Sequence, residues 1–289
     1  MQIISGSSNQ PLAQRIAQNT GYKLLKTKIG NFSDGELKVE IQDNIGKDVI
    51  IIQSISHPVN DHLIELLLLV DTARRAGAQN IISVVPYFAY IRQDRCTYKY
   101  GPISASLVIK LLEAAGVTKV ITLDLHSKQL EGVFNVPIIN LDPASIFFPF
   151  YNDDVNIVVV SPDIGGIARA NNFSIFLGKD LVIMNKIRDV DNECYMNKII
   201  GNVENKKCII IDDIVDTGGT ICKAAELLRS NGALNIEAYV THPVLSADSK
   251  EKIMNSQIDK IFVSDSIYHG SMPSKFVVTY IDELISCRL

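Results

Sequence analysis

The segment from Asp212 to Thr220 is rich in glycine, threonine and aspartate, and it directly follows the run Ile209 to Ile211. Gly218 and Gly219 have no Cβ, so their backbone N–H groups can come close to a ligand. Thr217 and Thr220 add hydroxyl groups, and the helical pattern that follows offers a positively polarised N-terminus. Strand, tight loop and helix in this order predict a site for a phosphate group.

The acidic pair Asp212 and Asp213 precedes this loop. Two carboxylates would repel a phosphate placed beside them, so we expect them to accept hydrogen bonds from sugar hydroxyls or to reach Mg²⁺ through water. The segment therefore suits a sugar phosphate better than a nucleoside triphosphate. An ordinary turn with a capping threonine would explain the glycines, but it would not explain the paired acids.

Polar residues follow three other apolar runs as well, at Asp124 to His126, Ser161 to Gly166 and Asn185 to Arg188. Ligands of open parallel sheets collect beyond the carboxyl ends of the strands. Charged residues also end strands simply by meeting solvent, but four such ends in one chain favour a binding site. The chain has neither the Gly-x-x-x-x-Gly-Lys-Ser/Thr phosphate loop nor the Gly-x-Gly-x-x-Gly dinucleotide fingerprint, which makes a P-loop NTPase or a Rossmann dehydrogenase a poor fit.

Short β-branched runs alternate with segments of helical spacing, which predicts parallel βαβ units with helices on both faces of each sheet. The expected strands are 49–52, 81–85, 120–123, 157–160, 181–184, 208–211, 236–240 and 261–263. The expected helices are 60–76, 103–115, 167–177 and 220–231.

The stretch from Asn140 to Asn156 contains Pro143 and Pro149 between two series of strands, which suggests a domain boundary near residue 145. We expect an N-terminal α/β domain over 1–145 and a C-terminal α/β domain over 146–289. The last helix is a candidate to pack back on the first domain.

Composition narrows the class of protein further. In 289 residues, 47% are apolar and 21% are charged, which is the balance of a globular protein. The 28 basic residues against 32 acidic ones give a net charge of −4, so a nucleic-acid partner is not expected. No apolar run reaches the length of a membrane span, and the five scattered cysteines are expected to be free thiols of a cytoplasmic protein.

Taken together, these motifs resemble a known family. The segment Asp212 to Thr220 looks like the 5-phosphoribosyl-1-diphosphate (PRPP) loop of type I phosphoribosyltransferase folds. The rest of the chain resembles the ribose-phosphate pyrophosphokinases through 31–36, 60–66, 85–95, 102–105, 124–126, 161–166 and 241–243. The resemblance implies two phosphoribosyltransferase-like α/β domains, each with a mostly parallel sheet flanked by helices.

The family reaction is diphosphoryl transfer from ATP to the anomeric hydroxyl of ribose 5-phosphate, giving PRPP and AMP for nucleotide biosynthesis. Carried over by motif, the resemblance implies that ATP is bound by Phe32, Asp34, Gly35, Glu36, Arg92, Gln93 and His126, the loop with Phe32 coming from a neighbouring subunit. It implies that ribose 5-phosphate is bound by Arg188, Asp212, Asp213, Asp216, Thr217, Gly218, Gly219 and Thr220.

Lys186 and Arg188 match the basic pair of the family's catalytic flexible loop, although without the family solvated charges at the end of a strand would be the favoured interpretation. His126 and Asp163 match the family's Mg²⁺ positions. One nitrogen and one oxygen donor suit a Mg²⁺ ion that keeps most of its ligands as water and phosphate oxygens. A homo-oligomer built of dimers, with a hexamer as the family form, is also implied.

The resemblance is interrupted at Cys96 to Tyr100, where the common form has a charged run that contributes to an anion site for phosphate or ADP. We therefore expect activity that needs little inorganic phosphate. Two alternatives remain open on sequence: a non-catalytic regulatory homologue, and a nucleobase phosphoribosyltransferase that consumes PRPP. The first would not need the intact loop and basic pair, and the second would have no use for Arg92 and Gln93.

Overall fold

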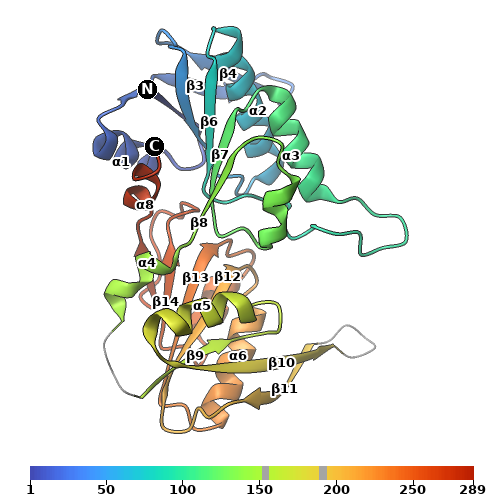
Figure 1. Ribbon diagram of the computed structural model, residues 1–289, viewed down its shortest axis with the longest axis vertical. Helices are drawn as coiled ribbons and strands as arrows, with labels where there is room; N and C mark the ends of the chain where they lie inside the picture. The colour runs from blue at the N-terminus through green and yellow to red at the C-terminus, as the bar shows by residue number, and fades with distance from the viewer. Residues whose placement is uncertain (152–155, 189–193) are drawn as a thin grey trace. The chain divides into compact units, whose positions relative to one another are not determined.

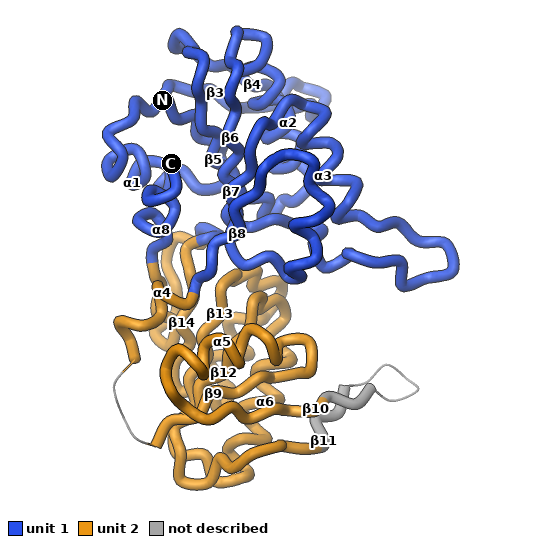
Figure 2. Tube along the Cα trace, in the orientation of Figure 1, with its two compact units in different colours: residues 1–143, 266–268, 280–289 blue, residues 144–265, 269–279 orange. Residues whose placement is uncertain are grey.

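A computed structural model of the chain describes residues 1–151, 156–188 and 194–289, without the side chains of 186–197 (Figure 1). The described chain divides into two compact units (Figure 2). Unit 1 comprises residues 1–143, 266–268 and 280–289, and unit 2 comprises residues 144–265 and 269–279.

Unit 1 is built on a six-stranded, wholly parallel sheet in the order β2-β1-β5-β6-β7-β8. Val49 to Ile52 in its interior are buried, as expected of a strand covered on both faces. The bounds are β1 Gln2–Ser5, β2 Lys23–Leu24, β5 Asp48–Ile52, β6 Asn80–Val85, β7 Lys119–Leu123 and β8 Ile138–Leu141.

Four α-helices and one short 3-10 helix (Lys128–Val133) belong to unit 1. The α-helices are α1 Gln10–Thr20, α2 Val59–Arg75, α3 Ser104–Ala115 and α8 Asp282–Ser286. The start of α1 is fixed by Asn9, whose side chain accepts a hydrogen bond from the backbone N–H of Leu12 at 3.2 Å. A hairpin of β3 Thr27–Asn31 and β4 Leu37–Ile41 forms a separate two-stranded antiparallel sheet.

Unit 2 is built on a seven-stranded sheet in the order β11-β10-β9-β12-β13-β14-β15. Its strands are parallel except for the antiparallel pair β10 and β11. The bounds are β9 Ile157–Ser161, β10 Asp180–Arg188, β11 Cys194–Ile200, β12 Lys207–Val215, β13 Asn235–Pro243, β14 Lys260–Ser264 and β15 Phe276–Thr279.

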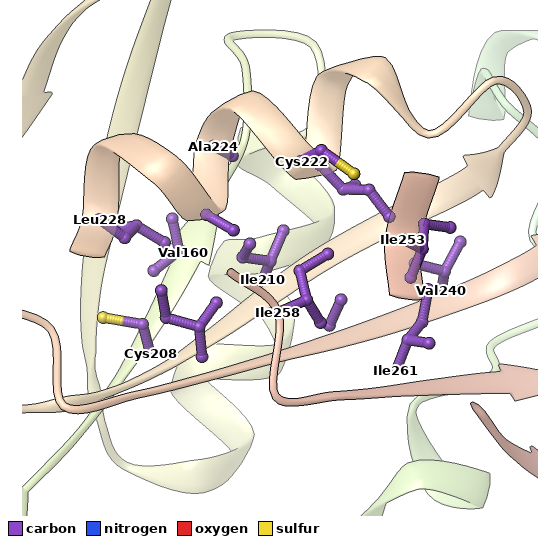
Figure 3. Packing of buried hydrophobic residues seen from close by; sticks show 14 of the residues in the cluster. Val160, Cys208, Ile210, Cys222, Ala224, Leu228, Val240, Ile253, Ile258 and Ile261 are labelled. Carbon is purple, nitrogen blue, oxygen red and sulfur yellow. The ribbon is translucent and has the colours of Figure 1, made fainter. Parts of the chain in front are cut away.

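The sheet of unit 2 has a hydrophobic cluster on each face, because alternate residues of a strand point to opposite sides. One cluster lies beneath α6 Gly219–Ser230 and α7 Ser249–Met254 and includes Val160, Cys208, Ile210, Ala224, Leu228 and Ile253 (Figure 3). The other lies beneath α4 Ala144–Phe147, a 3-10 turn over Phe148–Phe150 and α5 Ile167–Leu177, and includes Val159, Phe173, Ile209 and Tyr239.

The predicted α/β class is confirmed, and every expected strand lies within an observed one. Three expected strand ends were wrong, and one of these strands, expected over 236–240, continues to Pro243. The strand expected over 208–211 continues to Val215, because Asp212, Ile214 and Val215 still pair with β13. The strand expected over 181–184 continues to Arg188, because it pairs with β11, which the sequence pattern did not reveal. In the described parts of the chain, no helix combines the length and the apolar character needed to cross a membrane.

Candidate active site

The acidic pair lies within β12 rather than beyond its end. Asp213 is buried, with 4% of its surface exposed, while Asp212 is half-buried. The backbone N–H of Asp213 donates a hydrogen bond to Asp212 Oδ1 at 2.9 Å. On the neighbouring helix α5, Arg169 forms an ion pair with Asp213, with Nη1 and Oδ1 3.5 Å apart. The two carboxylates are therefore held at a fixed place in the sheet.

The electrostatics of this pair are unfavourable for two full negative charges. Burial, together with the charge of Asp213 and a hydrogen bond to it, raises the pKa of Asp212 well above its usual range. Asp163 raises the pKa of Asp212 further, whereas Arg169 lowers it. The site therefore favours ligands that bring positive charge or hydrogen-bond donors, such as a divalent cation or sugar hydroxyls.

The loop after β12 leads directly into α6. Gly218 caps the helix with a left-handed backbone, φ +74°, and is buried. Cβ at this position would lie 3.3 Å from Ile253 Cγ1, so a side chain is disfavoured both by conformation and by space. Gly219 is less constrained, because its added Cβ would only reach ordinary contact with Thr217 Oγ1 at 3.7 Å. The loop thus presents backbone amides at a helix N-terminus, the arrangement that binds phosphate.

Asp163 lies in the turn between β9 and α5, in the same unit. Its Oδ1 accepts a hydrogen bond from the Gly166 backbone N–H at 2.9 Å, and its carbonyl oxygen accepts one from Ser161 Oγ at 2.7 Å. Since Asp163 also acts on the pKa of Asp212, the carboxylate after β9 and the acidic pair on β12 belong to the same site.

In unit 1, Phe32 and the acids beside it lie in the loop between β3 and β4. The Phe32 ring is 51% exposed, and Lys38 Nζ lies 5.6 Å from its centroid. Asp34 Oδ1 accepts a hydrogen bond from the Glu36 backbone N–H at 3.1 Å, and Gly35 supplies a positive φ of 95° for the turn. The loop therefore presents an aromatic face next to two exposed carboxylates.

Arg92 and Gln93 follow β6 and are exposed. The Gln93 side chain is held by Ser104, whose Oγ donates to Gln93 Oε1 at 2.5 Å, and its backbone N–H donates to the Tyr90 carbonyl at 2.9 Å. His126 is exposed after β7, in the turn that begins at Asp124 with a positive φ of 44°.

The structure thus groups the predicted residues by unit. Asp163, the acidic pair and the glycine loop come together in unit 2, while the Phe32 loop, Arg92 with Gln93, and His126 belong to unit 1. Lys186 and Arg188 lie on β10, but their side chains lie outside the described residues. The altered segment Cys96–Tyr100 forms an exposed loop, in which the Cys96 thiol donates to the Tyr98 carbonyl at 2.9 Å.

Arg169 was not among the predicted site residues. It stands in the first turn of α5, next to Ala170, which faces the core. The sequence did contain a signal, because a basic residue at the start of a helix opposes the positive end of the helix dipole and needs another reason to be there.

The metal candidates are one residue from each unit, His126 and Asp163. Within the residues that the structure describes, no three His, Cys, Asp or Glu side chains are grouped so that they could hold a metal ion by themselves. Carboxylates with the charge repulsion found around Asp212 suit a hard divalent cation whose other ligands are water and phosphate oxygens.

Two mostly parallel α/β units, one carrying an acidic pair and a glycine loop at a helix N-terminus, define the class of proteins with phosphoribosyltransferase-like folds. Residues 1–116 match the model of the N-terminal domain of ribose phosphate pyrophosphokinase, and residues 184–286 match that of the phosphoribosyl synthetase-associated domain. The chain belongs to the ribose-phosphate pyrophosphokinase family of enzymes.

Relatives match along nearly the whole chain. A ribose-phosphate pyrophosphokinase of Thermosipho africanus is 43% identical over 290 residues, covering 99% of this chain and 92% of the relative. The enzyme of Helicobacter hepaticus is 46% identical over 268 residues, covering 92% and 87%. The crystal structure of phosphoribosylpyrophosphate synthetase from Mycobacterium smegmatis superposes with a TM-score of 0.93 at 29% identity, covering 99% of this chain and 96% of that one.

Proposed function

We propose that this chain transfers the β,γ-diphosphoryl group of ATP to the anomeric hydroxyl of ribose 5-phosphate, giving PRPP and AMP for nucleotide biosynthesis. The observation that carries the proposal is the sequence of β12, acidic pair, glycine loop and α6 N-terminus in a member of this family. That arrangement offers separate places for a sugar and its phosphate.

The loop and the acids divide the binding of ribose 5-phosphate. Backbone N–H groups at Gly218, Gly219 and Thr220, with the hydroxyls of Thr217 and Thr220, would hold the 5-phosphate at the N-terminus of α6. Asp212, Asp213 and Asp216 offer carboxyl oxygens that accept hydrogen bonds from hydroxyl groups, so they suit the ribose rather than its phosphate.

ATP is assigned to the exposed segments of unit 1. The Phe32 ring offers an aromatic face for adenine, and Asp34 and Glu36 can accept hydrogen bonds from its amino group or from the ribose. Arg92 supplies a guanidinium for phosphate oxygens, and Ser104 fixes the orientation of the Gln93 amide. Gly35 allows the tight turn, and His126 completes the set assigned to the nucleotide.

Lys186 and Arg188 are assigned to catalysis, with Arg188 also contacting ribose 5-phosphate. Diphosphoryl transfer asks for little covalent chemistry from the protein, but negative charge must be stabilised on the transferred group as the bond to AMP breaks. These two basic residues, which stand on β10, can supply the positive charge. His126 and Asp163 would hold Mg²⁺, which when bound neutralises charge on the ATP phosphates.

We further place the chain in the cytoplasm as a homo-oligomer. The described cysteines are free thiols, which suits a reducing compartment. The dimer-based assembly, with a hexamer as the expected form, follows the family resemblance and the expected contribution of the Phe32 loop to a neighbouring subunit.

Replacement of Lys186 tests the catalytic assignment. In Lys186→Ala we expect turnover to fall by about a hundredfold or more, with a much smaller change in the KM for ATP, because the charge serves the transition state. Steady-state kinetics with AMP and PRPP quantified together measure both values. Lys198→Ala, an exposed lysine on β11, is the matched control and should keep the parent turnover. Unchanged turnover in Lys186→Ala would remove this residue from the mechanism.

A further inference from the structure

We propose that Ser246 is a positioning residue for Asp216 and, through Asp216, for the glycine loop over Thr217 to Thr220. The proposal rests on the proposed function, because it assigns ribose 5-phosphate as the ligand that gains from the positioning. Ser246 follows β13, far from the loop along the chain, and no motif of the sequence pointed to it.

Ser246 contacts Asp216 through both side chain and backbone. Its Oγ donates a hydrogen bond to Asp216 Oδ1 at 2.5 Å, and its backbone N–H donates to the Asp216 carbonyl oxygen at 3.2 Å. One residue earlier, the Leu245 N–H donates to the Val215 carbonyl at 3.0 Å. These bonds extend the contact between β12 and β13 beyond their last paired residues, Val215 and Pro243. A carboxylate held in this way meets ligand hydroxyls in one orientation.

The backbone around Ser246 is held in a strained conformation. Leu245 and Ala247 both have a φ of +51°, a left-handed conformation that is unfavourable for residues with a side chain. Strain of this kind persists only where surrounding contacts impose it, and it is concentrated at functional sites. The two strained residues flank Ser246, which indicates that the segment is shaped for its contact with Asp216.

Helix α7, which follows Ser246 in the chain, lies close to the same loop. The Ser249 carbonyl and the Ile253 side chain of α7 would lie 3.7 Å and 3.3 Å from a Cβ at Gly218. Ile253 is fully buried in the cluster that also contains Cys222 of α6 and Val240 of β13 (Figure 3). Residues 246–253 therefore bind the loop at Asp216 and lie close to Gly218.

The test replaces Ser246 by alanine and by threonine. Ser230→Ala is the matched control, since Ser230 is also exposed and donates one hydrogen bond, to the Leu227 carbonyl at 2.9 Å, at the other end of α6. In Ser246→Ala we expect the KM for ribose 5-phosphate to rise about three- to tenfold, as the loss of one hydrogen bond predicts, with kcat and the KM for ATP changed less. Ser246→Thr should restore the parent KM.

Amide hydrogen exchange in the unliganded protein gives a readout that does not depend on catalysis. Exchange at Thr217 to Thr220 should be faster in Ser246→Ala than in the parent, Ser246→Thr and Ser230→Ala. Unchanged exchange in Ser246→Ala would overturn the positioning role, as would faster exchange without a change in the KM for ribose 5-phosphate. A parent protein that forms no PRPP contradicts the proposed function instead, and the exchange comparison then still decides whether Ser246 orders the loop.

Discussion

Asp213 places a carboxylate in the interior of unit 2, where only charge partners and hydrogen bonds make an ionised acid tolerable. Arg169 is the cation beside it, and the side chain of Arg169 is only 20% exposed. Asp212 is the neighbour of Asp213 in the chain, and the pKa of Asp212 is raised. The charges of Asp212, Asp213 and Arg169 therefore depend on one another, and a bound cation or hydrogen-bond donor would change the electrostatic energy of all three.

Removal of the Arg169 charge should disturb both stability and function. For Arg169→Met we expect unfolding free energy to fall by about 1.5–3 kcal/mol, because a charge-assisted contact to a buried acid is lost. The KM for ribose 5-phosphate should rise as well. Lys207→Met is the matched control: it breaks the Lys207–Glu237 ion pair, 2.8 Å long, at the opposite end of β12. Urea denaturation measures the free energy of unfolding of both variants, and steady-state kinetics measure their KM for ribose 5-phosphate. Equal KM values in the two variants would contradict a role for Arg169 at the site.

The raised pKa of Asp212 predicts how stability varies with pH in the absence of metal. Between the ordinary carboxyl pKa and the raised one, the folded state keeps a proton that the unfolded state has lost. The free energy of unfolding of the parent should therefore fall as pH rises through that window and level off above it. In Asp212→Asn this fall should be smaller, so the free energy of unfolding of the variant should increase relative to that of the parent as the pH approaches neutrality. Parallel pH profiles in urea denaturation would argue against the shift.

The residues of the site differ in how far the sequence could predict them. The acidic pair and glycine loop stand together in the chain, so their spacing alone indicated a sugar phosphate. Arg169 and Ser246 act on these residues from other elements, and only the parallel order β9-β12-β13 brings them there. Pairings between distant segments leave no local pattern, so the sequence offered no signal for Ser246 and, for Arg169, only its unusual place in the first turn of a helix.

At the scale of elements, the site depends on the junction between β12 and α6. Pairing with β13 continues through the acids to Val215, and the chain then needs a left-handed residue to enter the helix. Apolar runs predicted the central strands well. Seven observed strands were not predicted: β1, β2, β3, β4, β8, β11 and β15. Of these, β3 and β4 alternate between half-buried and exposed residues and lack a continuous apolar run.

Replacement of Gly218 and of Gly219 by alanine should distinguish a glycine needed for the backbone conformation from one needed for access of the ligand. Gly218→Ala should destabilise the protein by about 1–2 kcal/mol, because a left-handed φ of +74° is unfavourable for a residue with Cβ and Ile253 is only 3.3 Å away. Gly219→Ala should be tolerated in the free protein, since it meets nothing closer than 3.7 Å, although it can weaken phosphate binding. Thermal unfolding of both variants provides the measurement. An equal loss of stability would contradict the assigned backbone geometry.

At the scale of the whole molecule, the chain returns to unit 1 at its C-terminal end. Arg15 Nε lies 2.9 Å from Asp282 Oδ1, and Asn19 Nδ2 donates to Asp282 Oδ2 at 2.7 Å. The Arg15 guanidinium also lies 4.5 Å from the centroid of the Tyr280 ring. The place of α8 in unit 1 is therefore set by long-range contacts, for which the sequence could offer only an expectation.

Asp282→Ala should loosen α1 without affecting unit 2. Loss of two hydrogen bonds to a carboxylate with an 11% exposed side chain should reduce the protection of α1 amides by about tenfold or more. Amide exchange in α1 and α6 measures both units at once. Asp259→Ala, which removes the partner of Arg229 at 2.8 Å in unit 2, should give the reverse pattern. Equal loss of protection in both helices for Asp282→Ala would contradict this account.

We expect the chain to transfer a diphosphoryl group rather than a single phosphoryl group. Phosphorus NMR of the protein with Mg²⁺, ATP and ribose 5-phosphate resolves every product in one sample. We expect AMP and PRPP to rise in equal amounts, no ADP to form, and chelation of Mg²⁺ to stop the formation of both products together. Formation of ADP with a singly phosphorylated product, or the absence of AMP and PRPP, would contradict this expectation.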